Sequence, residues 1–127
     1  MNKVVHFEVP ADDLARAKEF YSNVFSWQLQ DVPEASYVMA NTVHVDPVTY
    51  KPTEVGINGG MLLRNEHVKS PVITIEVESI DDHLKKIEEA GGKVVAPKTS
   101  VMDMGFSAYI KDTEGNIIGL WENKPQT

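Results

Sequence analysis

The residues most able to do chemistry stand near the start of the chain, in "VVHFEVPADD" at residues 4–13. Side chains in a strand alternate between its two faces, so His6 and Glu8 share one side and the apolar residues around them take the other. An imidazole titrates near neutral pH and a nearby carboxylate tunes it, so this pair could act as a general base and acid. His6 and Glu8 could instead be metal ligands, or a hydrogen-bonded histidine beside a solvated glutamate.

A second stretch, "PVITIEVES" at residues 71–79, repeats this pattern. Thr74 and Glu76 alternate with aliphatic residues, which predicts a second strand with one polar face. The two strands together predict a quasi-symmetric polar patch suited to ligand binding.

Each polar strand is followed by an amphipathic helix, because apolar residues then recur at helical spacing. Asp12 or Asp13 can cap the first helix, and Ser79 can cap the second. The pair Gly91-Gly92 supplies the left-handed stop that a helix end favours.

Three short strand-like runs follow each helix, so each half of the chain reads βαβββ. The segment 43–58, broken by prolines and a glycine, predicts a loop, and the polar segment 65–71 predicts a linker. We therefore expect one α+β domain over residues 1–127, with a first module at about 1–64 and a second at about 72–124.

Composition narrows the classes of function. The 127 residues carry a net charge of -7 and no cysteine. A negative chain without clustered Lys and Arg is unsuited to a phosphate backbone or a membrane surface, so we expect no nucleic-acid or membrane partner. Without cysteine there is no disulfide and no thiolate nucleophile, and the start of the chain does not read as a signal peptide, so we expect a cytoplasmic protein.

The duplicated βαβββ pattern, the Asp-Leu and "EFY" of the first helix, and the "D-x-x-G-N" turn near the end resemble the vicinal oxygen chelate superfamily. This group includes glyoxalases, bleomycin resistance proteins and extradiol dioxygenases. The resemblance covers nearly the whole chain. It implies two tandem modules that form a curved, mixed sheet cup for a small ligand, with the helices outside, and a homodimer.

The resemblance also implies where a divalent metal would bind, and this sequence departs from that pattern. His6 matches one ligand position, but Val72, Gly60 and Gly119 occupy the other three. A catalytic ion needs about three protein ligands, so we expect no metal cofactor, with His6 as the remnant of a ligand set. An unusual site made of His6, Glu8 and Glu76 stays open.

Aromatic residues on the predicted strands could wall the cup, although each could equally fill the core. The two glycines at the former ligand positions would leave room for a ligand, or mark a bend. The predicted ligand-binding residues are His6, Glu8, Trp27, Tyr37, Gly60, Thr74, Glu76, Tyr109, Gly119 and Trp121.

Three functions follow from these features. The first is binding of a small organic molecule in the cup without a metal, as resistance proteins of this superfamily do. The second is a lyase or isomerase related to lactoylglutathione lyase, with His6 and Glu8 as catalytic residues. The third is a structural or regulatory dimer whose cup is closed by side chains.

Overall fold

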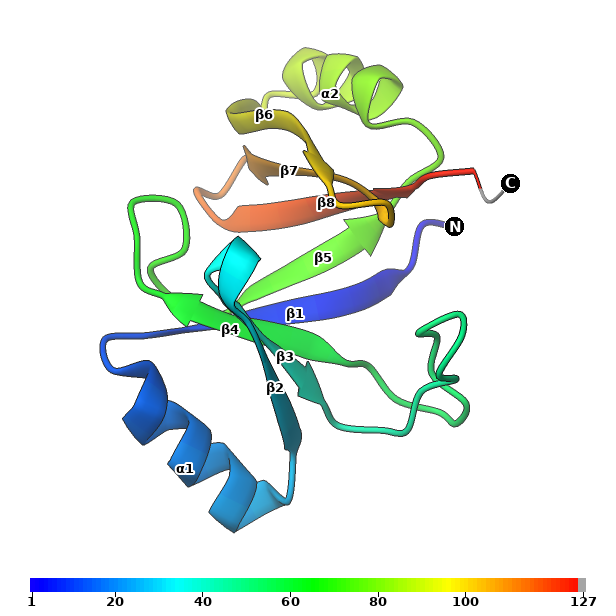
Figure 1. Ribbon diagram of the computed structural model, residues 1–127. Coiled ribbons are helices and arrows are strands. Elements are labelled where there is room, and N and C mark those ends of the chain that lie inside the picture. Colours follow the sequence, from blue (N-terminus) through cyan, green and yellow to red (C-terminus); the bar gives the residue numbers. More distant parts are fainter. Residues whose placement is uncertain (126–127) are drawn as a thin grey trace. The chain divides into compact units, whose positions relative to one another are not determined.

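The computed structural model describes residues 1–125 and contains two βαβββ modules, as the sequence predicts (Figure 1). Its contacts divide the chain into two units. The first unit is His6–Pro71, and the second consists of Met1–Val5 and the chain from Val72 onward. No helix in the described part of the chain is long and apolar enough to cross a membrane.

The first unit is built on a four-stranded half-sheet in the order β2-β3-β4-β1. Strand β4 is antiparallel to β3 and parallel to β1, and β2 is antiparallel to β3. Its elements are β1 (Val4–Ala11), whose first two residues group with the second unit, α1 (Leu14–Phe25), β2 (Gln28–Val32), the short 3-10 helix η1 (Pro33–Ala35), β3 (Tyr37–Asn41) and β4 (Gly59–Leu63).

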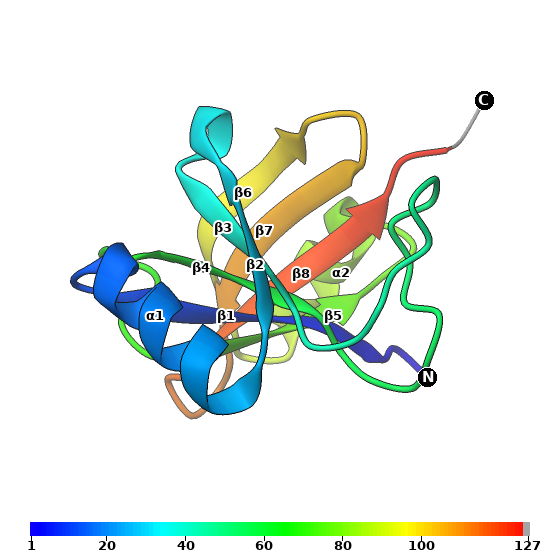
Figure 2. The same ribbon diagram turned by 60° about the horizontal axis from the view of Figure 1, so that its bottom comes forward.

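Helix α1 begins where the sequence predicts. The Asp13 carboxylate accepts a hydrogen bond from the Arg16 backbone N–H at 3.0 Å, which satisfies one of the free donors at the helix start. Figures 1 and 2 both show α1 beside β2. The apolar side of α1 packs on a buried cluster of Val38, Ala40 and Met61, so this face of the half-sheet is the helix-covered face.

The second unit contains β5 (Val72–Glu76), α2 (Ile80–Glu89), β6 (Lys93–Val101), β7 (Gly105–Lys111) and β8 (Ile117–Asn123). Its half-sheet has the order β5-β8-β7-β6, with β5 parallel to β8 and the other neighbours antiparallel. Helix α2 lies against β6, β7 and β8 (Figure 1).

Both predicted signals at the ends of α2 are confirmed. Ser79 Oγ accepts from the Asp82 N–H at 3.2 Å, and Gly91 adopts the left-handed backbone with φ +100°. The Gly92 N–H then donates to the Ile87 carbonyl at 2.8 Å, which closes the last turn.

The structure differs from the predicted organisation at two places. The Glu76 N–H donates to the Lys3 carbonyl at 2.9 Å, so the first five residues group with the second unit and not with the first. Segment 65–71 is polar in sequence, yet its Val68 is only 1% exposed, and the Asn65 side chain accepts from the Val68 N–H at 2.8 Å. This segment is a folded loop of the first unit.

Candidate functional site

The first unit presents His6 on the face opposite α1. Val9 packs against the helix-covered cluster, so the alternation of β1 turns His6 and Glu8 to the other face. Glu8 pairs with Gly60 in the parallel register of β1 and β4, and Tyr37 reaches the same face from β3. We call this set, His6, Glu8, Tyr37 and Gly60, the His6 face.

Tyr37 occupies the space that a side chain at position 60 would take. A Cβ built on Gly60 would collide with the hydroxyl and ring carbons of Tyr37. The Tyr37 hydroxyl also forms a 2.8 Å hydrogen bond with His6 Nε2, and the tautomer of His6 sets which group donates. The absence of a side chain at Gly60 therefore makes room for Tyr37 and leaves no open space beside this glycine.

Electrostatics favour the neutral imidazole at His6. Burial lowers the pKa of His6 from its ordinary value of 6.5, and the nearby negative charge of Glu8 opposes this shift. Glu8 itself is only 7% exposed. A neutral histidine hydrogen-bonded to a phenol and close to a carboxylate can take up or pass on a proton, which is the chemistry of a general base.

The second unit has a corresponding polar face, on the side of its half-sheet away from α2. Leu120 and Ala108 belong to the cluster packed on α2, so alternation turns Gly119 and Trp121 to the other face. Thr74 pairs with Gly119, and Glu76 pairs with Trp121. Tyr109 also pairs with Gly119, from β7, so Thr74, Glu76, Tyr109, Gly119 and Trp121 form what we call the Thr74 face.

Thr74 limits the room beside Gly119. A Cβ built on this glycine would lie 2.6 Å from Thr74 Oγ1, and Thr74 is 8% exposed. Each of the two glycines at the ligand positions that the resemblance implies is thus approached by a polar side chain of its own unit, Tyr37 at Gly60 and Thr74 at Gly119.

Asn123 joins Trp121 to Glu76, and sequence reasoning missed it. Trp121 Nε1 donates to Asn123 Oδ1 at 2.8 Å, and Asn123 Nδ2 donates to Glu76 Oε1 at 2.6 Å. Asn123 lies two residues after Trp121, so the same alternation that selected Trp121 could have identified it.

The predicted placement of Trp27 on the same face as His6 is wrong. Its ring stacks on Tyr21 of α1 with centroids 4.6 Å apart, and it packs on the helix-covered cluster of the first unit. A tryptophan just before an edge strand can reach an amphipathic helix, and burying its large ring there is favourable.

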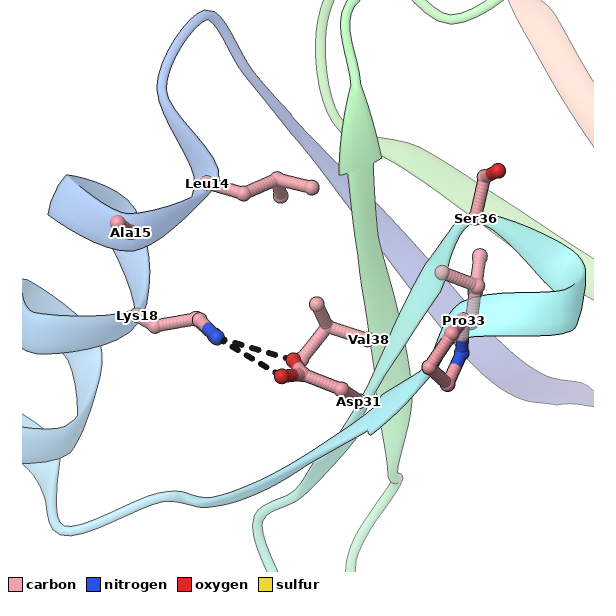
Figure 3. A pocket seen from close by; sticks show the side chains of 8 residues that line it. Leu14, Ala15, Lys18, Asp31, Pro33, Ser36 and Val38 are labelled. Carbon is pink, nitrogen blue, oxygen red and sulfur yellow. Dashed lines mark hydrogen bonds and ion pairs between the residues drawn. The ribbon is translucent and has the colours of Figure 1, made fainter.

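A shallow groove of about 310 Å³ in the first unit was not predicted (Figure 3). It lies between α1 and the β2–β3 strands, and Figure 3 shows Leu14 and Val38 beside it. Lys18 Nζ binds the Asp31 carboxylate at 2.9 Å along one side. Its lining comes from separate elements, so no local pattern in the sequence marks it.

The described residues form no cluster of metal-binding side chains. Within residues 1–125, no three His, Asp or Glu side chains gather closely enough to hold an ion. Of the four ligand positions implied by the resemblance, His6 alone carries a metal-binding group. Val72 is buried, and the two glycines have no side chain.

The sequence profile of the Glyoxalase/Bleomycin resistance protein/Dioxygenase superfamily matches residues 3–120. The chain belongs to this superfamily. The family resemblance read from the two βαβββ repeats is therefore confirmed, as is the α+β fold.

Among curated relatives, "Putative glyoxylase CFP32" of Mycobacterium bovis is 27% identical over 121 residues. The match covers 91% of this chain and 43% of that protein, so this chain spans less than half the length of the relative.

Solved structures share the superfamily fold at low identity. A hypothetical protein from Bacillus halodurans C-125 has a TM-score of 0.66 and 17% identity, covering 99% of this chain and 97% of that one. A methylmalonyl-CoA epimerase variant from Streptomyces coelicolor, in complex with 2-nitronate-propionyl-CoA, has a TM-score of 0.64 and 14% identity, covering 98% and 99%. At these identities the likeness concerns the fold.

Proposed function

We propose that this superfamily member binds a small organic molecule on its polar strand faces, without a resident divalent ion. The observation that carries the proposal is the position of Tyr37, whose hydroxyl fills the space at Gly60 and binds His6. This tyrosine supports a hydrogen-bonding site for an organic ligand in place of a metal centre. The His6 face and the Thr74 face each carry polar groups and an aromatic ring that suit the recognition of such a ligand.

Elemental analysis of the purified full chain followed by a thermal-shift screen tests this function. The screen uses small aromatic compounds and 2-oxo aldehydes, each with and without nickel, zinc or manganese. We expect well below one ion per chain and a metal-independent rise in Tm of about 2 °C or more with at least one compound, because a ligand of the native state stabilises it. Near-full metal occupancy would contradict the proposal.

Variants show whether a shift comes from the proposed faces. Tyr37→Ala or Trp121→Ala should abolish the shift of a compound that binds there, because each removes a ring or hydroxyl from those faces. Val48→Ala is the matched control, since Val48 is 83% exposed in the 43–58 loop. A compound whose shift survives both test variants binds elsewhere.

A second function, a lyase or isomerase related to glyoxalase, is favoured by the environment of His6. The neutral imidazole of His6 is hydrogen-bonded to Tyr37 and lies near the Glu8 carboxylate, an arrangement typical of a general base. The test is turnover of a 2-oxo aldehyde with glutathione in the presence of a chelator. Loss of that turnover in His6→Gln with an unchanged Tm would support catalysis, and equal turnover in both proteins would exclude His6 as the catalytic base.

The proposal includes a homodimer, which the family resemblance supports. It also includes a cytoplasmic location, which agrees with the absence of cysteine. Light scattering on the full chain after size-exclusion chromatography tests the oligomeric state. A mass near 14.1 kDa would show a monomer and remove this part of the proposal.

A further inference from the structure

The hydrogen-bonded cluster of Trp121, Asn123 and Glu76 has a fixed direction. An indole N–H can only donate, so the Asn123 oxygen must face Trp121, at 2.8 Å. The Asn123 amide nitrogen is then turned toward the Glu76 carboxylate, at 2.6 Å. The donor on one side and the acceptor on the other therefore fix the orientation of the Asn123 amide.

Trp121 offers a rigid aromatic surface. Its indole lies against the backbone of Gly105, where a Cβ would come within 2.5 Å of the ring carbon Cζ2. The hydrogen bond to Asn123 holds the indole nitrogen, and the residue is only partly buried. A ring already held in one orientation loses little entropy when a flat molecule stacks on it.

Glu76 carries a negative charge that its surroundings do not neutralise. Within residues 1–125 it has no ion-pair partner, and its second oxygen, Oε2, has no hydrogen bond. It lies directly across from Trp121 in the register of β5 and β8. A carboxylate beside an indole attracts cations in two ways, by its own charge and by the electron-rich face of the ring.

We propose that these three residues form a subsite for the positively charged, N–H-bearing end of a planar organic ligand. Trp121 stacks on the ligand, Glu76 accepts its N–H groups, and Asn123 is a positioning residue that holds both. This inference rests on the proposed function, because it names the chemistry of the molecule that the strand faces would bind. The net charge of -7 also attracts cations to the protein.

Three planar probes of nearly equal shape test the charge preference: benzamidinium, benzamide and benzoate. Each is titrated into the 15N-labelled full chain while the two tryptophan indole resonances are followed. Trp27→Phe assigns them, because it removes one of the two. We expect benzamidinium to shift the Trp121 resonance with a Kd in the millimolar range, and the neutral and anionic probes to bind about fivefold more weakly or worse.

Substitutions then separate the roles of the residues. Glu76→Gln keeps an oxygen for Asn123 but removes the charge, so benzamidinium should bind about fivefold more weakly at unchanged Tm. Glu89→Gln, on the exposed side of α2, removes the same charge from the protein and should change nothing. Asn123→Ala should weaken benzamidinium binding and speed solvent exchange of the Trp121 indole proton, because both partners are released.

Two results would overturn the inference. One is equal binding of all three probes, or tighter binding of benzamide or benzoate at Trp121, which would leave ligand binding intact but remove the cation preference. The other is a benzamidinium titration that Glu76→Gln does not alter, or that produces no shift at all. The proposed function would still stand or fall on its own metal analysis and screen.

Discussion

Gly59 and Gly60 are neighbours in β4, yet a side chain at each would meet a different obstacle. At Gly60 it would meet the end of the Tyr37 side chain. That side chain can rotate to another position, but it then loses its hydrogen bond to His6. At Gly59 an added side chain would meet the Phe7 backbone carbonyl and, at 2.6 Å, the Phe7 ring. Backbone cannot move aside as a side chain can.

We therefore expect Gly60→Ala to lower the free energy of unfolding by about 1 kcal/mol, the net worth of one hydrogen bond. Gly59→Ala should lower it by about 2–3 kcal/mol, because it overpacks a place that cannot relax. Urea denaturation of both variants measures the difference. Tyr37→Phe is the control for Gly60→Ala, since it removes the same hydrogen bond without a new side chain. A larger loss at Gly60 than at Gly59 would show that Tyr37 is held rigidly.

The lowered pKa of His6 predicts a pH dependence of stability. A histidine whose folded-state pKa lies below its unfolded value of 6.5 binds fewer protons when folded. The contribution of His6 to the free energy of unfolding is therefore fully present above pH 6.5 and is lost as the pH falls toward the folded-state pKa. His6→Gln should flatten the stability curve in this window. Denaturation at pH 7.5 and 5.5 measures it.

The acidic groups with lowered pKa values do not interfere with that test. The pKa values of Asp46 and Asp112 are lowered from 3.8 and that of Glu54 from 4.5, in each case chiefly by a backbone N–H donor, so their contributions are lost at lower pH than that of His6. Equal pH dependence in wild type and His6→Gln would contradict the assignment of the window to His6.

At the scale of the element, the start of helix α2 depends on a side chain of strand β8. Glu122 of β8 accepts the Ile80 backbone N–H at 2.8 Å, while Ser79 accepts a second donor of the same first turn. Helix starts leave such donors free, and acidic groups there are also favoured by the helix dipole. Local sequence identified Ser79 but could not identify Glu122.

Glu122→Ala should lower the free energy of unfolding by about 1–2 kcal/mol, because a partly buried N–H loses its acceptor. Glu122→Gln keeps an acceptor oxygen and should cost less than half of that. Thermal or urea unfolding with the two variants side by side gives the comparison. If Glu122→Ala proves no worse than Glu122→Gln, the contact of Glu122 with α2 has no role in stability.

At the scale of the whole molecule, the chain's first residues complete its second unit. The Lys3 carbonyl accepts from the Glu76 N–H at 2.9 Å, and the Asn2 side chain donates to the Glu76 carbonyl at 3.1 Å. These two hydrogen bonds fix the backbone of β5 at Glu76, the residue that we propose binds a ligand. Segments far apart in sequence thus support one strand.

Removal of residues 1–3 should therefore speed hydrogen exchange of the Glu76 amide by about fivefold or more, the equivalent of one lost hydrogen bond. The Leu120 amide, in the core of the second unit, is the internal reference and should change much less. Equal acceleration at both amides would mean that the whole unit is destabilised and that the contact is not local.

The sequence by itself determined the features that depend on local periodicity. Alternation placed His6 with Glu8 and Thr74 with Glu76, and Asp13, Ser79 and Gly91 mark helix ends as predicted. These signals act within a few residues of the chain, so they can be read from it directly.

The tertiary structure alone decided what fills the spaces that those patterns leave. Tyr37 reaches Gly60 from another strand, Trp27 turns to α1, and Asn123 connects Trp121 to Glu76. Each depends on strand register and on packing between residues distant in sequence, and alternation specifies the face of a strand but not its neighbours. The contacts with which this protein could recognise a ligand are therefore properties of the fold.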